Sequence, residues 1–353
     1  MNSFGNSIRL TLFGESHGAA LGCTFDGLPA GFVPDLERVE FELTRRAPHS
    51  GVESTRRSET DRYSVLSGML NGACTGAPLT VVFENRDARS ADYCADIPRP
   101  SHADLAARLK YKGFNDHRGG GMFSGRMTLP LVFAGALCRQ LLEAAGILIA
   151  SHISSIGGIQ DVRFDPCMKT LPQLDPHFPL VDPRLRAEID ALFSDLRRSG
   201  DSVGGSVECA ALGVPAGIGE PFFNGLESCI AHILFSVPGV HGVEFGAGFG
   251  FSGMRGSEAN DPISPDLTTL SNNSGGINGG ISNGMPIVFR AAFRPVPSIA
   301  LPQRTVDLST SEAVTLEIKG RHDCCILPRA CAAVEAAAAI ALYDSLKHSE
   351  VIV

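Results

Sequence analysis

Apolar residues that alternate with polar ones, or that form short continuous runs, predict strands along most of the chain. Glycine and proline separate these runs, which is typical of strands joined by tight turns. The predicted strands lie within residues 7–13, 21–34, 64–85 (strand, turn, strand), 147–159, 206–214, 243–251, 286–293 and 313–320.

Other stretches place apolar residues at helical spacing. Asp35 can cap the first of these helices and Pro48 follows its end, while another begins near Ser101 and His102 with Asp104 in its first turn. The last is rich in alanine, so we expect it to pack closely against a neighbour. The predicted helices cover residues 35–48, a stretch from 101 onward, 129–146, 182–200, 224–239 and 328–348.

Strands and helices interleave without the regular spacing of βαβ units, which favours an α+β fold. A chain of 353 residues is long enough for two domains. However, the proline-rich residues 164–183 fit a surface insertion as well as a boundary, and no other linker is evident. We therefore predict one large α+β domain over residues 1–353.

The charge pattern favours a small anionic ligand over a nucleic acid. The formal net charge is −8, which argues against a general nucleic-acid surface. Basic residues nevertheless gather in three places, although each alone fits solvated surface charge equally well. The groups are Arg45, Arg46, Arg56, Arg57 and Arg62; Arg99, His102, Lys110, Lys112, His117, Arg118 and Arg126; and Lys319, Arg321 and His322.

The ten cysteines predict reduced, mostly buried thiols. None forms a C-x-x-C motif and several lie in apolar runs, as expected in a reducing compartment. No zinc or other metal site is expected, because cysteine and histidine pairs at ligand spacing are lacking. The first residues have no apolar signal core and no apolar run reaches about 18 residues. We expect a cytoplasmic protein with no membrane association.

Residues 14–18, Gly-Glu-Ser-His-Gly, formally match the G-x-S-x-G turn that presents a nucleophilic serine. That turn needs a helix directly after it, whereas the following residues resemble a strand. A hydrolase that uses Ser16 is therefore one hypothesis, and a glycine turn that brings His17 close to a ligand is another.

Two further stretches combine glycine with polar residues. Residues 99–130 contain His102, three consecutive glycines, Ser124 and Arg126, which together can present amides and cations to a phosphate. Residues 271–299 contain so much glycine and asparagine that a regular element is not expected there. Each stretch has a purely structural alternative, a tight turn in the first and a mobile loop in the second.

Residues 319–330 place Arg321, His322 and Asp323 side by side after a predicted strand. A carboxylate between cations should stay ionised, which suits it to accept a proton or to orient a donor. The alternative is a surface ion pair that contributes little.

Taken together, these segments resemble the chorismate synthase family. The resemblance follows the family's order over nearly the whole chain. The motifs are FGESHG (13–18), RPSHAD (99–104), DHRGGGMFSGR (116–126), GDSVGGSVE (200–208), GVPAGIGEP (213–221), GVEFGAGF (242–249), SNNSGGINGGISNG (271–284) and GRHDCCILPRA (320–330).

The resemblance implies a lyase of the shikimate pathway, which serves aromatic amino acid biosynthesis. Such an enzyme eliminates phosphate from 5-enolpyruvylshikimate 3-phosphate in an anti-1,4 reaction that needs reduced FMN and gives chorismate. It implies a single-domain βαβ sandwich, usually assembled as a homotetramer. NADPH is implied only if the enzyme reduces its own flavin. A substrate with a phosphate and two carboxylates explains the arginines of an acidic protein.

Site roles follow from the resemblance position by position. His17 would face the reduced flavin, His102 would protonate the departing phosphate, and Asp323 would help a flavin nitrogen take the ring proton. Substrate-binding positions are Ser16, Arg46, Arg99, Arg126 and Arg321. Flavin-binding positions are Met122, Phe123, Ser124, Pro238, Gly239, Gly279, Arg294, Pro295, Val296, Pro297, Ser298 and again Arg321. Met122 and Phe123 depart from the arginine and serine of many members, Arg294 replaces a lysine, and Cys324 replaces a proline.

Three alternatives to this lyase differ in what they require. A hydrolase depends on Ser16, and a non-catalytic flavin- or anion-binding protein has no need of His17, His102 and Asp323 together. A dinucleotide dehydrogenase built on residues 245–253 lacks the βαβ unit and the following acidic residue.

Overall fold

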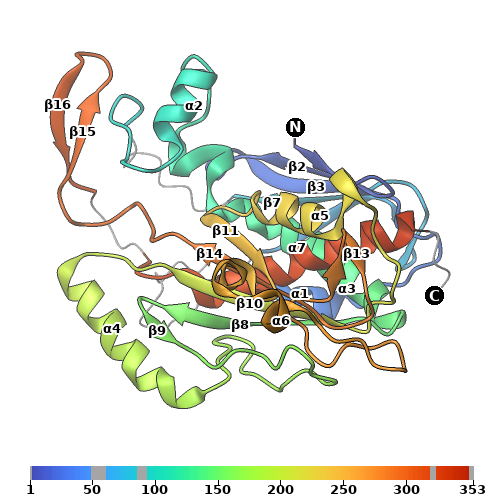
Figure 1. The fold of residues 1–353 in the computed structure, drawn as a ribbon. Helices are drawn as coiled ribbons and strands as arrows, with labels where there is room; N and C mark the ends of the chain where they lie inside the picture. The colour runs from blue at the N-terminus through green and yellow to red at the C-terminus, as the bar shows by residue number, and fades with distance from the viewer. Residues whose placement is uncertain (1, 49–60, 86–93, 319–322, 350–353) are drawn as a thin grey trace.

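The computed structural model describes residues 2–48, 61–85, 94–318 and 323–349. Two antiparallel five-stranded sheets form its outer layers (Figure 1). The first has the strand order β1 (Ser3–Phe4), β2 (Arg9–Gly14), β3 (Ala20–Asp26), β7 (Leu79–Glu84), β4 (Tyr63–Ser67). The second has the order β11 (Val240–Phe245), β14 (Ile287–Phe293), β10 (Gly205–Leu212), β8 (Leu148–Ile156), β9 (Ile159–Gln160).

Four helices fill the layer between the sheets (Figure 1): α1 (Leu36–Arg46), α3 (Thr128–Ala144), α5 (Leu226–Leu234) and α7 (Leu327–His348). One hydrophobic cluster runs from the first sheet through these helices to the second. The predicted α+β class and βαβ sandwich are therefore confirmed, while the single-domain assignment stays a prediction.

The remaining elements lie outside the sandwich. Helix α2 (Asp104–Lys110) and the hairpin of β15 (Gln303–Asp307) and β16 (Glu312–Leu316) project together from one edge (Figure 1). Hydrogen bonds from Thr305 Oγ1 to the Pro98 carbonyl and from the Leu308 amide to the Asp96 carbonyl join them. The others are α4 (Arg186–Ser199), α6 (Gly256–Ala259), the pairs β5 (Met69–Leu70)–β6 (Ala73–Cys74) and β12 (Ile277–Asn278)–β13 (Ile281–Ser282), and the 3-10 helices η2 (Arg118–Phe123), η3 (Gly125–Met127), η4 (Pro183–Leu185), η5 (Phe222–Asn224) and η6 (Gly248–Gly253).

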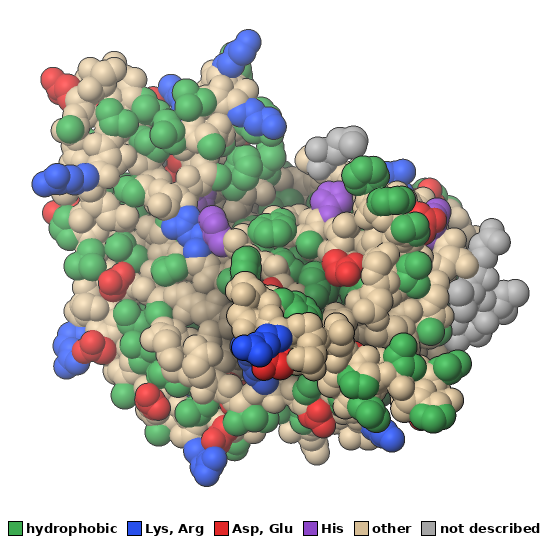
Figure 2. Space-filling view, in the orientation of Figure 1, with side chains coloured by type: hydrophobic (Ala, Val, Ile, Leu, Met, Phe, Trp, Pro, Cys, Tyr) green, Lys and Arg blue, Asp and Glu red, His purple; other side chains and the backbone are tan. Residues whose placement is uncertain are grey.

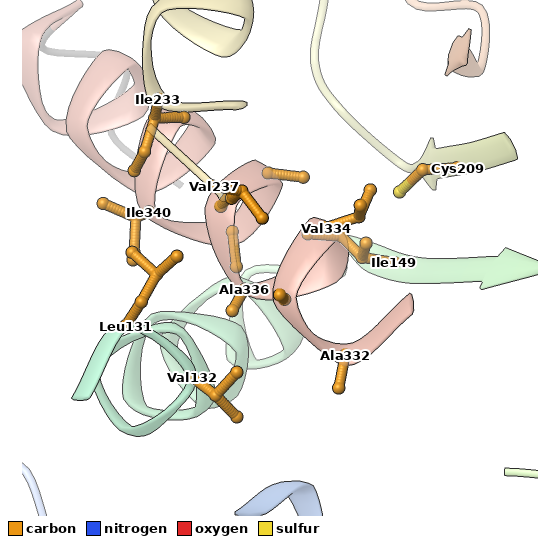
Figure 3. Close-up of a cluster of buried hydrophobic side chains, with 14 of the residues drawn as sticks. Leu131, Val132, Ile149, Cys209, Ile233, Val237, Ala332, Val334, Ala336 and Ile340 are labelled. Carbon is orange, nitrogen blue, oxygen red and sulfur yellow. The ribbon is translucent and has the colours of Figure 1, made fainter. Parts of the chain in front are cut away.

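Helices α3 and α7 cross at a very short distance. A Cβ atom added to Gly135 of α3 would lie 2.3 Å from the Cβ of Ala336 on α7, so only glycine fits there. Figure 3 shows the apolar side chains around this crossing, contributed by α3, α5, α7 and the second sheet. The close packing predicted for the alanine-rich helix is confirmed.

Two carboxylates of α7 fasten it to distant parts of the chain. Glu335 is buried and accepts hydrogen bonds from Arg45 of α1, Arg139 of α3 and Ser151 of β8. Burial alone would raise the pKa of Glu335, but Arg45 and Arg139 outweigh it and lower this pKa to about 2. At the other end, Asp344 accepts the backbone amides of residues 6, 7 and 8 at 2.7–3.0 Å.

A mostly buried ladder of ionisable side chains crosses the second sheet. His152, Glu208, Arg290 and Glu244 stand directly opposite one another on β8, β10, β14 and β11. The two ring nitrogens of His152 lie 3.1 Å from Asp161 and 3.0 Å from Glu208, and Arg290 binds both Glu208 and Glu244. We call these residues the sheet ladder; it attaches residues 161–182 to the sheet, because Asp161 also accepts the amides of residues 181 and 182.

Most predicted elements are present, and two of the differences have a clear cause in the backbone. The strand predicted over residues 243–251 ends at Phe245 and continues into η6, since Gly246 and Gly248 adopt positive φ angles that a strand does not use. Helix α2 begins at Asp104 rather than near Ser101, because Ser101 has a φ of +61°.

Two further expectations concern the burial of the cysteines and the lack of a long apolar run. Seven of the ten cysteines are buried, whereas Cys167 and Cys229 are half-buried and Cys94 is exposed. Burial raises the pKa of the Cys23 and Cys331 thiols to about 12. Among the described residues, Gly125–Ala144 is long and apolar enough to cross a membrane, but most of it is buried within the fold, as in a core helix.

Candidate active site

Ser16 and His17 lie in a tight turn between β2 and β3, and both are buried. The Gly18 amide donates to the Glu15 carbonyl, and Asn85 Nδ2 donates to the carbonyls of Glu15 and Gly18. The next element is the antiparallel partner strand β3, not a helix. The interpretation of residues 14–18 as a nucleophile elbow is therefore wrong.

The three consecutive glycines separate His17 from His102. Gly119, Gly120 and Gly121 have φ angles of +60°, +83° and +55°, a region that L side chains rarely adopt. A Cβ on Gly119 would lie 2.4 Å from Cδ2 and 2.5 Å from Nε2 of His17. A Cβ on Gly120 would lie 3.2 Å from Nε2 of His102. Adjacent glycines thus contact the two histidines, which are 85 residues apart in the sequence.

His102 belongs to a charged cluster at the foot of the projection formed by α2, β15 and β16. Its Nδ1 lies 2.5 Å from Asp104 Oδ1, and Arg99 binds the same carboxylate through Nε at 2.7 Å. Burial alone would raise the pKa of Asp104, but hydrogen bonds from His102 and Arg99 hold it well below its usual range. Figure 2 shows basic and histidine side chains together where the projection meets the body.

The loop of residues 294–298 lies against this cluster. Arg99 Nη1 donates to Ser298 Oγ at 3.1 Å, and the Arg294 guanidinium donates to the Ser101 carbonyl. The Arg294 amide donates to the Gly239 carbonyl at 2.9 Å, which brings Pro238 and Gly239 to the same place. Two predicted flavin segments and the predicted phosphate-side histidine are therefore neighbours.

Arg46 and Arg126 share one carboxylate, that of Asp61. Arg46 Nη1 lies 3.4 Å from Asp61 Oδ2 and Arg126 Nη1 lies 3.2 Å from Oδ1. Arg126 Nε also donates to Asn85 Oδ1 at 2.8 Å, so Asn85 connects this pair to the turn that contains His17. Burial, helped by repulsion from Arg329 and Arg126, lowers the pKa of Arg46 to about 10. The carboxylate of Asp61 opposes this shift.

A pocket with about 360 Å³ of empty space, part of it open to solvent, adjoins the arginines. The Arg329 guanidinium at its wall donates to Asp323 Oδ2. The wall combines two arginines with an apolar surface, as a ligand with both anionic and apolar parts requires. The lining residues are Arg46, Gly125, Thr128, Val237, Pro238, Phe293, Ile326, Arg329, Ala330 and Ala333.

Not every predicted position joins this site. Met122, Phe123 and Ser124 follow the glycines directly and precede Arg126. Gly279 instead lies in the β12–β13 turn, where Gly280 accepts the Leu226 amide at the start of α5. Pro238 follows the other end of that nine-residue helix, about 14 Å away along its axis. Arg321 lies outside the described residues.

Sequence reasoning missed several residues of the site. Asp61, Asn85 and Arg329 were given no role, yet each binds a predicted site residue. Arg329 could have been identified from the sequence, because it lies in the first turn of a predicted helix that begins shortly after Asp323. Asp61 and Asn85 have none, because their partners are far away in the sequence.

Comparisons with known proteins agree with one another. A sequence model of the family described as "Chorismate synthase" matches residues 8–346. A chorismate synthase of Thermococcus gammatolerans is 46% identical over 351 residues, which cover 97% of this chain and 96% of that protein. One of Dehalococcoides mccartyi is 44% identical over 355 residues, with coverage of 97% and 96%. A solved structure titled "Crystal Structure of Chorismate Synthase" matches with a TM-score of 0.74 and 27% identity, covering 97% of this chain and 92% of that one.

Proposed function

The chain belongs to the chorismate synthase family, and we propose that its residues form two groups with separate tasks in the reaction. It is a lyase that forms chorismate from 5-enolpyruvylshikimate 3-phosphate with release of phosphate. The proposal concerns the residues that do this. His17 and His102 handle protons, while Arg46, Arg99, Arg126 and Arg321 hold the anionic groups of the substrate together with Ser16.

The observation that carries the division of tasks is the contact of Gly119 with His17 and of Gly120 with His102. Any side chain at either position would meet a histidine ring, so only glycine lets this backbone lie between the two histidines. Histidine can donate and accept protons near neutral pH, which suits a general acid for the departing phosphate. His102 would hold that proton at Nε2, the ring atom on the Gly120 side.

The arginines supply binding rather than proton transfer. Arg46 and Arg126 share the carboxylate of Asp61, and Arg329 is paired with Asp323. These pairs bring three guanidinium groups close to the pocket among the described residues. Guanidinium groups bind carboxylate and phosphate oxygens in a bidentate manner, so they would fix the substrate's orientation as well as its affinity. We add Arg329 to the predicted substrate-binding set.

The described residues also fit a flavin mononucleotide. Met122 and Phe123 offer apolar surface for a ring system, Ser124 and Ser298 offer hydroxyls, and Arg294 offers a cation for a phosphate. Gly239 has a φ of +97°, which favours glycine, and a side chain there would lie 3.2 Å from Ile326 and 3.4 Å from Phe293. Pro238 and residues 294–298 adjoin this position, whereas Gly279 lies beside the start of α5.

Reduced FMN, when bound, would supply electron density to the carbon–oxygen bond that breaks. His17 would hold a proton at its ring beside Gly119, where a donor stabilises negative charge. Asp323, oriented by Arg329, would accept a hydrogen bond or proton at Oδ1 or Oδ2. On the family's pattern we also propose a cytoplasmic homotetramer that binds neither membranes nor nucleic acid, and NADPH use only if the chain reduces its own flavin.

An anaerobic assay tests the proposal. The purified chain is mixed with enolpyruvylshikimate phosphate and chemically reduced FMN, and chorismate absorbance and phosphate release are followed. Both products should appear together and only with reduced flavin. His17→Ala and His102→Ala should each lower kcat by about 10²–10⁴. Ser16→Ala should lower it less than about tenfold, because a binding hydroxyl contributes a single hydrogen bond.

His348→Ala provides the matched control, since His348 is a surface residue at the other end of α7 and should retain full activity. Loss of all activity in Ser16→Ala with an active His17→Ala would reverse the assignment. Flavin binding without product would support the non-catalytic alternative. Oxidised FMN with NADPH in the same assay would show whether the chain reduces its own flavin.

A further inference from the structure

Asp104 uses both of its carboxylate oxygens on the two residues that the proposed function places beside the departing phosphate. Oδ1 lies 2.5 Å from His102 Nδ1 and 2.9 Å from Arg99 Nη2. Oδ2 lies 2.7 Å from Arg99 Nε and 3.1 Å from the Arg99 amide. The Arg99 side chain is thus held in the two-bond geometry that guanidinium and carboxylate groups prefer.

Asp104 and Arg99 compete for the same ring nitrogen. Arg99 Nη2 lies 3.1 Å from His102 Nδ1 and 3.4 Å from Nε2, and a guanidinium group can only donate hydrogen bonds. A contact from Arg99 alone would require a bare Nδ1 and would move the ring proton to Nε2. The ionised carboxylate can only accept, and it is the closer partner by 0.6 Å, from 2.5 against 3.1 Å. The proton therefore stays on Nδ1.

We infer that Asp104 is a positioning residue that keeps the proton of neutral His102 on Nδ1 and reserves Nε2 for proton exchange with the substrate, an inference that rests on the proposed role of His102. In the step itself, the imidazolium gives its Nε2 proton to an oxygen of the departing phosphate. It becomes neutral with its remaining proton on Nδ1, and Asp104 stays ionised throughout. A carboxylate with this task on a catalytic histidine serves enzymes of other folds in the same way.

The first test compares three variants in the anaerobic assay. Asp104→Asn should lower kcat about 100-fold or more while KM changes less than about fivefold, because Arg99 keeps its contact with Ser298. Asp104→Glu should recover kcat to within about tenfold of the natural chain, since it restores the acceptor. Asp96→Asn is the matched control, because Asp96 pairs with Arg108 of α2 rather than with His102. This variant should leave kcat and KM unchanged.

The second test needs neither substrate nor flavin. Nitrogen-15 spectra of the histidine rings identify which nitrogen carries the proton, and His102→Gln assigns the signal by its disappearance. The natural chain should show the proton on Nδ1 at alkaline pH, and Asp104→Asn should move it to Nε2. An unchanged Nδ1 signal together with kcat within threefold of the natural chain would overturn the inference. If the natural chain forms no chorismate, the proposed function fails, while the spectra still decide what Asp104 does.

Discussion

His102 and His152 both belong to networks of carboxylates and arginines, but they use their ring nitrogens differently. His152 has a carboxylate on each nitrogen, Asp161 on one side and Glu208 on the other, and it is completely buried. His102 has one carboxylate, on Nδ1, whereas its Nε2 edge faces Gly120 and lies 3.4 Å from Arg99 Nη2. A ring with both nitrogens fixed to carboxylates can hold strands together but has none left for a substrate. This contrast supports a structural role for His152 and the proposed catalytic role for His102.

The largest expected effects come from the same substitution at the two positions. His152→Leu should lower the free energy of unfolding by about 3–5 kcal/mol, because Asp161 and Glu208 would lose a buried partner. Urea unfolding should show this loss, with kcat per folded molecule nearly unchanged. His102→Leu should do the reverse and lower kcat by about 10²–10⁴ at unchanged stability. If both variants lose stability alike, the two networks do not differ in kind.

A smaller effect should come from the glycines that contact the histidines. Gly119→Ala should lower kcat about 10- to 100-fold, since its Cβ would displace the His17 ring, and a shift of this kind costs catalytic alignment. Gly158→Ala is the control for backbone strain, because Gly158 has a φ of +94° with no atom within 4 Å of an added Cβ. Thermal unfolding should show a loss of about 1 kcal/mol for Gly158→Ala and a larger loss for Gly119→Ala, because only the second Cβ must displace a buried ring. Equal kcat values in the two would mean that contact with His17 is unimportant.

The smallest effect should be a dependence of stability on pH through the sheet ladder. Burial would raise the pKa of Glu208, but hydrogen bonds from His152, the Phe164 amide and Arg290 lower it. A lowered pKa stabilises the folded state above the ordinary glutamate value of about 4.3, and this contribution disappears as pH falls through the folded-state value. Urea unfolding should therefore show a difference in the free energy of unfolding between the natural chain and Glu208→Gln. This difference should be largest at pH 6 and should decrease below about pH 4. A gap that widens on acidification would contradict the assignment.

Local sequence signals predicted much of the fold. The Asp35 cap was confirmed, since its carboxylate accepts the Arg38 amide at the start of α1, and Gly200 ends α4 in the left-handed conformation. The hairpin of β15 and β16 was only half predicted, because residues 303–307 lack an apolar pattern and gain their order by pairing. The strand propensity of single residues predicts little where pairing with a neighbouring strand determines the structure.

The candidate site was predicted through a resemblance more than through physics. The sequence places His102 in a basic, glycine-rich stretch with Asp104 two residues away, but it does not show that His152 is held between two carboxylates, because Glu208 reaches it only through folding. The glycines at 119–121 suggested a close approach, but the sequence did not say that His17 is the neighbour. Pairs such as Arg126 with Asp61, 65 residues apart, form only when distant segments meet.

The bonds from Asp344 to residues 6–8 have a consequence for how the protein is made. These partners are separated by as many as 338 residues, and at about 5–20 residues per second the ribosome needs on the order of tens of seconds to deliver the second after the first. The first strand must therefore remain without its fastening for most of synthesis, with its apolar face open to wrong partners. Contacts of such long sequence separation are slow to form. The last helix completes the first sheet, so a chain released early would be an aggregation hazard rather than a partly working enzyme.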